Sequence, residues 1–134
     1  MIGLLSVKFT KSGRRTIQLE RNGNSLYLPM KIKDVELKFL IDTGASNMVI
    51  YKSSYSKISD NYNYSKSIEI VIADGRKKVC PVINFSYING KTYNTEIAIM
   101  EDSGNKPFDG LIGIELLDQM KASIDIEHNC MYIE

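Results

Sequence analysis

Residues 39–50 read Phe-Leu-Ile-Asp-Thr-Gly-Ala-Ser-Asn-Met-Val-Ile, which sets one acidic side chain, Asp42, between two apolar runs. Short apolar runs bounded by a turn predict buried strands, and Asp-Thr-Gly favours a tight turn between them. A lone carboxylate held among buried strands costs several kcal/mol unless it is paired, so stability gives no reason for it. Asp42 is therefore a candidate functional residue.

The length and charge of the chain restrict its class. Its 134 residues fit one domain over residues 1–134, with a sizeable core and no room for a second lobe. A formal charge of +1 gives no field that would attract nucleic acid or an acidic membrane surface. The apolar start breaks at Ser6 and Lys8, short of a secretory signal, and no run reaches the ~18 residues that span a bilayer. We expect a soluble, cytoplasmic protein without nucleic-acid or membrane partners.

Apolar and polar residues alternate along most of the chain, which predicts a mostly β protein. Hairpins are expected before residue 25, about Asp74-Gly75 and about Asn89-Gly90. Residues 26–32 and 36–41 predict a strand pair that leads into Asp42, and residues 124–126 and 131–133 predict the last strands. The Tyr-, Ser- and Asn-rich residues 51–64 predict a surface loop with at most one helical turn. Helical spacing occurs only over residues 111–120.

Other residue types with catalytic chemistry are sparse. The single histidine, His128, excludes a multi-histidine metal centre, and its place beside Asn129 predicts a solvated turn residue. Cys80 and Cys130 fit no metal or redox spacing, and we expect both to be small, half-buried hydrophobic residues. The sequence contains no glycine-rich phosphate loop. These observations predict neither a metal nor a cofactor and leave carboxylates as the catalytic candidates.

A pair of carboxylates has the chemistry for amide hydrolysis. Two carboxylates about 3 Å apart cannot both ionise cheaply, so they share a proton and can hold one water between a base and an acid. Thr43 offers a hydroxyl that ties two such loops together, and Gly44 permits the close backbone approach of facing loops. The chain contains one Asp-Thr-Gly, so the second copy must come from another molecule, in a two-fold symmetric homodimer.

The stretch Asp42-Thr43-Gly44-Ala45-Ser46 resembles the active-site loop of the retropepsin-like aspartic proteases, in their single-domain cellular and bacterial branch. The resemblance runs from about Leu26 to the C-terminus. Residues 68–82 are similar to the family's flap hairpin. Leu111-Ile112-Gly113 resembles its hydrophobic-hydrophobic-Gly element, and residues 114–120 resemble the short helix that follows it. The resemblance implies a closed all-β barrel with one short helix near the C-terminus.

The same resemblance implies the site and the activity. It implies that a homodimeric aspartic endopeptidase hydrolyses peptide bonds of an extended polypeptide, with a water activated between Asp42 of the two subunits. No metal or organic cofactor is implied. The catalytic residues would be Asp42, Thr43 and Gly44, and the substrate would contact Ala45, Ser46 and the flap tip Ala73-Asp74-Gly75.

Two positions depart from the viral members of this family. Those members carry Arg directly after the second glycine and Asp where Ser46 stands, and this chain has Ile114 and Ser46 instead. A salt-bridged support of the dimer is therefore missing. The hairpin within residues 1–25 is also additional to a minimal domain, and three roles are open for it: dimerisation, cover of a sheet edge, or an ordinary strand addition.

Simpler explanations exist for each motif. Asp42 can be a turn residue whose carboxylate caps local amides, and the fold can serve as a non-catalytic peptide-binding or dimerisation module. Asp109 is the rival for a second carboxylate from the same chain. A hydrolase or binding domain that uses His128 is the remaining alternative. The flanking apolar runs and the later elements favour catalysis by Asp42.

Overall fold

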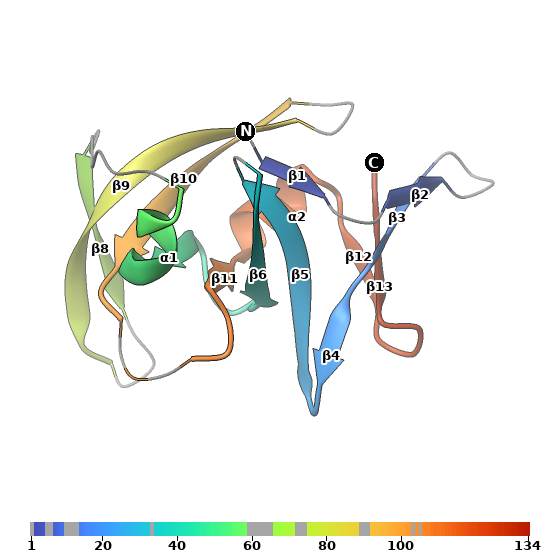
Figure 1. The fold of residues 1–134 in the computed structure, drawn as a ribbon, viewed down its shortest axis with the longest axis horizontal. Coiled ribbons are helices and arrows are strands. Elements are labelled where there is room, and N and C mark those ends of the chain that lie inside the picture. Colours follow the sequence, from blue (N-terminus) through green and yellow to red (C-terminus); the bar gives the residue numbers. More distant parts are fainter. Residues whose placement is uncertain are drawn as a thin grey trace.

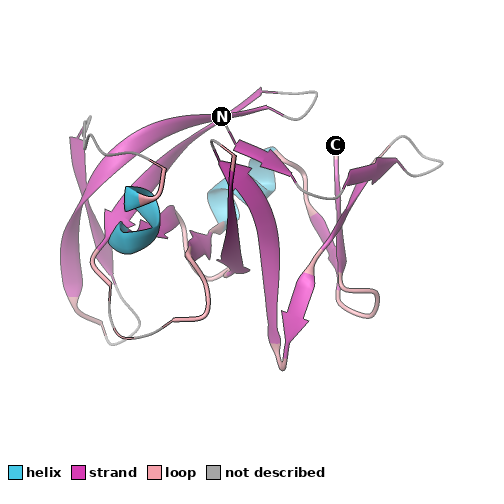
Figure 2. Ribbon diagram, in the orientation of Figure 1, coloured by secondary structure: helices cyan, strands magenta, loops and turns pink. Residues whose placement is uncertain are grey.

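The computed structural model describes residues 2–4, 7–9, 14–32, 34–58, 66–71, 75–88, 92–102, 104 and 106–134. Strands dominate these residues, which confirms the predicted β class, although two short helices form instead of one (Figure 2). The elements are β1 (Ile2–Leu4), β2 (Val7–Phe9), β3 (Arg15–Gln18), β4 (Glu20–Asn22), β5 (Ser25–Ile32), β6 (Val35–Ile41), β7 (Met48–Tyr51), α1 (Lys52–Ser56), β8 (Lys66–Val71), β9 (Lys77–Ile88), β10 (Thr92–Met100), β11 (Gly110–Ile112), α2 (Ile114–Gln119), β12 (Ser123–Asp125) and β13 (Cys130–Ile133).

The larger of two sheets closes into a barrel. Its strands follow the order β1-β5-β6-β11-β7-β10-β9-β8, with β4 paired to β5. A parallel pairing of Ile2 with Tyr87 joins β1 back to β9, so the predicted closed barrel is confirmed. The second sheet, in the order β12-β13-β3-β2, lies beside β4 and β5 (Figure 1).

The hairpins form where turn residues predicted them. Strands β2 and β3 pair antiparallel before residue 25, β8 pairs with β9, and β9 pairs with β10. The single long strand β9 therefore belongs to two hairpins. The N-terminal segment does more than form its own hairpin, because β1 and β4 both pair with β5 and so belong to the barrel.

One apolar core connects the two sheets. Phe39, Ile50 and Ile112 from the barrel belong to the same buried cluster as Ile17 and Met131 from the second sheet. The two sheets therefore bury a common apolar interior, which is the main source of stability for a domain of this size. A smaller cluster joins the β8–β9 hairpin to the barrel and contains Val49, Cys80 and Ala98, with Ile68, Ile70, Met100 and Leu111 packed against it.

Two sequence predictions about local structure were wrong in part. Residues 51–58 do not form a loose surface loop, since Tyr51, Tyr55 and Ile58 are buried and α1 supplies the one helical turn. The second error concerns the predicted helix over residues 111–120, because Leu111 and Ile112 pair with β6 and β7 as strand β11. The helix begins only at Ile114, after Gly113. None of the helices built from the described residues has the length and apolar character to cross a membrane.

Candidate active site

Asp42 follows the last residue of β6 and is fixed by its backbone. Its N–H donates to the carbonyl oxygen of Ile112 at 3.0 Å, which continues the parallel pairing of β6 with β11. Its own carbonyl oxygen accepts a hydrogen bond from the N–H of Ala45 at 3.1 Å, which closes the turn. The barrel therefore determines where this loop lies before any side chain is considered.

The Asp42 carboxylate is half-exposed and uses one of its two oxygens locally. Oδ1 accepts a hydrogen bond from the backbone N–H of Gly44 at 3.1 Å. This is the contact expected if Asp42 were only a turn residue that caps local amides. Among the residues that the structure describes, no donor contacts Oδ2. Thr43 and Gly44 are exposed beside it. The second oxygen is thus available to a water molecule or to a facing carboxylate.

The segment from Gly113 to Glu115 packs against this loop and forms hydrogen bonds with it. Ile114 and Glu115 donate their N–H groups to the carbonyl oxygens of Ala45 and Ser46, at 2.8 and 3.3 Å. A Cβ at Gly113 would lie 2.7–2.8 Å from the carbonyl oxygens of residues 45–47, so only glycine allows this approach. The carbonyls of Ala45 and Ser46 therefore hold the start of α2, and their contact with substrate stays a prediction.

Asp42 lines a groove of about 460 Å³ that sequence reasoning did not find. Most of its walls are apolar, and its lining residues are Asn24, Ser25, Leu26, Leu40, Ile41, Ile124 and Ile126 beside Asp42. Ile126 is 61% exposed although it is large and apolar. No local signal connects it with Asp42, because the two positions are far apart in sequence and only the packing of the two sheets brings them together.

The structure describes one of the three predicted flap-tip residues, and their contact with substrate stays a prediction. Strands β8 and β9 pair up to Val71 opposite Lys77, as the flap-like hairpin requires. Gly75 lies between them, exposed, with a φ of +89° that glycine adopts without strain. Ala73 and Asp74 lie outside the described residues.

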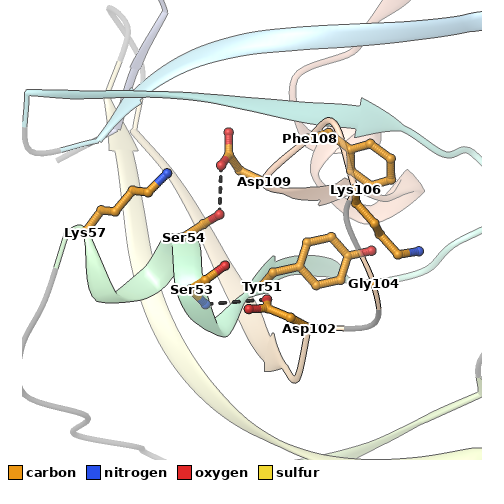
Figure 3. Close-up of a pocket in the computed structure, with 9 residues that line it drawn as sticks. All are labelled: Tyr51, Ser53, Ser54, Lys57, Asp102, Gly104, Lys106, Phe108 and Asp109. Atoms are coloured by element: carbon orange, nitrogen blue, oxygen red, sulfur yellow. Dashed lines mark hydrogen bonds between the residues drawn. The ribbon is translucent and has the colours of Figure 1, made fainter.

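Asp109 is a structural residue and not a second catalytic carboxylate within the chain. Oδ2 accepts a hydrogen bond from the backbone N–H of Lys38 at 2.8 Å, and Oδ1 accepts one from Ser54 Oγ at 2.7 Å (Figure 3). Since Gly110 lies opposite Phe39, Asp109 lies level with Lys38, four residues before Asp42. That separation is roughly 13 Å along a strand, too far for a shared water. The alternative of an intramolecular dyad with Asp109 is therefore wrong.

The pocket in Figure 3, of about 580 Å³, lies between α1 and a second group of lining residues, which are Asp102, Gly104, Lys106, Phe108 and Asp109. Its polar groups bind one another, since Asp109 contacts Ser54 and the Asp102 carboxylate lies 3.5 Å from the Ser53 N–H. Lys106 Nζ lies 5.6 Å from the ring centre of Tyr51. These contacts explain the pocket as a packing feature of the fold.

His128 lies in the β12–β13 turn, as predicted, and is 68% exposed. Its ring Nδ1 lies 2.8 Å from Asp125 Oδ2, and its backbone N–H donates to Asp125 Oδ1 at 3.1 Å. These hydrogen bonds lower the pKa of Asp125. A hydrogen bond with Cys130 raises the pKa of Tyr132 to about 12, so its hydroxyl stays protonated and donates to Asp125 Oδ2 at 3.4 Å. The cluster holds the hairpin together.

The remaining candidates behave as small apolar residues. Cys80 and Cys130 are both free and buried, somewhat more deeply than the half-burial expected from the sequence. Burial raises the pKa of the Cys80 thiol, which disfavours the reactive thiolate. Within the described ranges, the structure places no group of three or more histidine, cysteine, aspartate or glutamate side chains where they could hold a metal ion.

Known proteins resemble the chain in sequence and in fold. A family described as aspartyl protease matches residues 28–116. A DDI1 homolog from Leishmania major is 26% identical over 116 residues, which is 81% of this chain and 28% of that protein. An uncharacterized protein of Rickettsia prowazekii, RP867, is 29% identical over 108 residues, or 79% of this chain and 46% of that protein. The chain thus spans less than half the length of these two relatives.

Two crystal structures share the fold. A retropepsin-like aspartic protease from Rickettsia conorii matches with a TM-score of 0.60 and 21% identity, over 96% of this chain and 94% of that one. The retroviral protease-like domain of Ddi1 from Leishmania major matches with a TM-score of 0.57 and 22% identity, over 84% of this chain and 90% of that one. At such identities the two matches show the fold.

Proposed function

Because the chain belongs to the retropepsin-like aspartyl protease family, we propose that it hydrolyses peptide bonds as a homodimer, with Asp42 of each subunit in the catalytic dyad. The observation that carries the proposal is the position of the Asp42 carboxylate. It lies half-exposed at a groove, on a loop fixed by Ile112 and Gly113, with Oδ2 available.

The reaction needs no covalent intermediate. With one proton shared between two facing Asp42 side chains, the ionised carboxylate removes a proton from the water as the water attacks the scissile carbonyl. The protonated carboxylate donates a hydrogen bond to the carbonyl oxygen and later supplies the proton for the leaving amine. The activity is then expected to have a bell-shaped pH profile whose two limbs belong to the pair.

The substrate proposed for this site is an extended polypeptide. The β8–β9 hairpin would cover it, and backbone hydrogen bonds to strand-like edges would hold it in place. The partly buried side chains Ile68, Ile70 and Leu111 pack against the apolar cluster that joins this hairpin to the barrel. We therefore expect apolar residues next to the cleaved bond, because apolar surface favours apolar side chains.

Cleavage of a random peptide library, read by mass spectrometry, tests this proposal. We expect wild type to cleave and Asp42→Asn to lose cleavage by more than a hundredfold. The matched control is Asp34→Asn, which makes the same change at an exposed turn whose φ of +67° suits asparagine. Equal cleavage by wild type and Asp42→Asn would show that the activity does not depend on the dyad. Binding of peptides without cleavage would favour the non-catalytic module.

A further inference from the structure

The groove beside Asp42 is lined by three segments that are far apart in the sequence. Residues 24–26 come from the β4–β5 hairpin, residues 40–42 from the end of β6, and Ile124 and Ile126 from β12 and the turn after it. The β4–β5 turn and the β12–β13 turn lie at the same end of the molecule (Figure 1). The width of the groove therefore depends on how these two turns are held relative to one another.

Arg21 of β4 connects the two turns through its guanidinium group. Its Nε donates to the carbonyl oxygen of Gly23 at 3.0 Å, in the turn of its own hairpin. Its Nη1 donates to the carbonyl oxygen of Ile126 and to Asn129 Oδ1, both at 3.1 Å, in the turn of the other hairpin. Arg21 does not line the groove, so it acts on the groove through the two turns.

The guanidinium group suits this connection because its donors are separate and rigidly arranged. Nε and Nη1 are different nitrogens of one planar group, so Arg21 reaches both turns at once. A lysine carries a single nitrogen on a flexible stem and cannot reproduce these contacts. Arg21 also lies opposite Leu26, a groove residue, in the β4–β5 pairing. The connection is therefore made one strand away from the groove.

The β12–β13 turn has a second attachment, at its other end. The backbone N–H of Leu19 and the side-chain amide of Gln18 both donate to the carbonyl oxygen of Asn129, at 2.8 and 2.9 Å. The carbonyl oxygen of Ile126 is bonded instead by Arg21 and, at 3.4 Å, by the N–H of Asn129. Loss of the Arg21 side chain should therefore release the Ile126 end of the turn while the Asn129 end stays attached.

We propose that Arg21 is a positioning residue for the groove, because it holds the two turns at the separation that sets the groove's width. This inference rests on the proposed function, in which the groove accepts a side chain of the polypeptide next to the cleaved bond. An apolar pocket of fixed width discriminates about 10–200-fold between side chains that differ by one methylene group. Arg21 thus determines how strictly the size of that side chain is selected.

Two peptides that differ only in the size of one apolar residue next to the cleaved bond test the proposal. They carry the side chain that wild type prefers and one that it disfavours. The ratio of their kcat/KM values does not depend on the fraction of enzyme that is folded. We expect Arg21→Ala to shrink this ratio by about fivefold or more, and Arg21→Lys to behave alike, because it keeps the charge but loses the second donor. An unchanged ratio would overturn the proposal.

Arg14→Ala is the matched control. Arg14 Nη2 donates to the carbonyl oxygens of Lys121 and Tyr132, at 3.0 and 3.3 Å. These contacts lie at the opposite end of the β12–β13 hairpin from Ile126. Arg14→Ala should therefore lower the free energy of unfolding and leave the peptide ratio unchanged. An equal change of the ratio in Arg14→Ala and Arg21→Ala would attribute it to a general loss of stability and overturn the proposal.

Asn129→Gly tests the contact from its other side. It removes one acceptor of Arg21, and glycine adopts the φ of +50° at this position without strain. The ratio should shrink less than in Arg21→Ala, and the double variant should match Arg21→Ala alone. Additive effects in the double variant would contradict action through this contact.

Two measurements need no substrate. Hydrogen exchange, read by NMR, should be about tenfold faster in Arg21→Ala at the turn amides of His128 and Asn129, and unchanged at Leu19. The dimer dissociation constant, from sedimentation equilibrium, should stay within about twofold of wild type. A raised dissociation constant with an unchanged peptide ratio would place Arg21 in subunit assembly and overturn the proposal.

Failure of this inference and failure of the proposed function give different results. Asp42-dependent cleavage with an unchanged peptide ratio in Arg21→Ala would contradict the inference alone. A wild type that cleaves no peptide, with faster exchange at the turn in Arg21→Ala, would contradict the proposed function and, with it, a role of Arg21 in cleavage.

Discussion

Gly113 lies so close to Ala45 that a Cβ on the glycine would be 2.7 Å from the Ala45 carbonyl oxygen. The contact joins two segments nearly 70 residues apart and positions the Asp42 loop on the element that begins α2. The position of the Asp42 loop therefore depends on a residue that bears no functional group.

Substitution of this glycine should damage activity more than stability. We expect Gly113→Ala to displace the Asp42 loop, to lower kcat/KM by more than tenfold, and to cost about 1–3 kcal/mol in the free energy of unfolding, since the backbone of residues 45–47 must move to accommodate an extra methyl group. Peptide cleavage and urea unfolding measure the two effects. Gly104→Ala is the control, because it has open space but a φ of +73°, and it should cost about 1 kcal/mol while activity is kept. Similar activity in both variants would contradict the role of Gly113.

Asp109 should show the opposite behaviour. Its carboxylate accepts hydrogen bonds from the Lys38 N–H and from Ser54, so Asp109→Ala should lower the free energy of unfolding by about 2–3 kcal/mol. Ser54→Ala should cost about 1 kcal/mol, because it removes one of the two hydrogen bonds. Urea unfolding measures both. Activity per folded molecule should change little in either variant. A stable but inactive Asp109→Asn variant would contradict this structural role and favour a catalytic dyad of Asp42 and Asp109 within one chain.

The Asp125–His128 contact predicts a pH dependence of stability. Hydrogen bonds to His128 lower the pKa of Asp125 in the folded state, so their stabilisation is present above its ordinary pKa of 3.8 and is lost as pH falls through the lower folded value. Wild type should therefore be more stable than Asp125→Asn near pH 6, and the difference in urea midpoint should shrink below about pH 4. A difference that stays constant from pH 6 to pH 2 would show that the carboxylate does not act through its charge.

The exposed Ile126 predicts a concentration dependence of activity. If this side chain is buried between subunits, Ile126→Asp should raise the dimer dissociation constant by more than tenfold and shift half-maximal specific activity to higher protein concentration. Mass photometry and dilution assays measure the two quantities. Val79→Asp removes a 72% exposed apolar side chain away from β12 and should leave the dissociation constant unchanged. If the specific activity of Ile126→Asp does not depend on dilution, Ile126 is not buried between subunits.

Much of the barrel follows from local sequence. Alternating apolar residues and turn sequences such as Asn89-Gly90 locate most strands, because side-chain period and turn conformation are local properties. The Asp42 loop was predictable for the same reason, since a polar turn between two apolar runs leaves few alternatives.

The remaining features depend on packing between distant segments. Leu111 and Ile112 fit a helical period, yet they pair as a strand because β6 and β7 leave a space between them that only a strand fills. Tyr51 and Tyr55 lie in a polar stretch but are buried. Likewise, the approach of Ile124 and Ile126 to Asp42 follows from the packing of two sheets, which no local pattern encodes.

Mixing wild type with Asp42→Asn tests most directly whether each active site contains two Asp42 side chains. With wild-type concentration fixed and total protein well above the dimer dissociation constant, an equal amount of Asp42→Asn should reduce the activity to about half after subunit exchange, because mixed dimers hold one functional carboxylate. Asp34→Asn added in the same way should cause no such loss. An activity unchanged by Asp42→Asn, after exchange has been verified, would contradict the shared dyad.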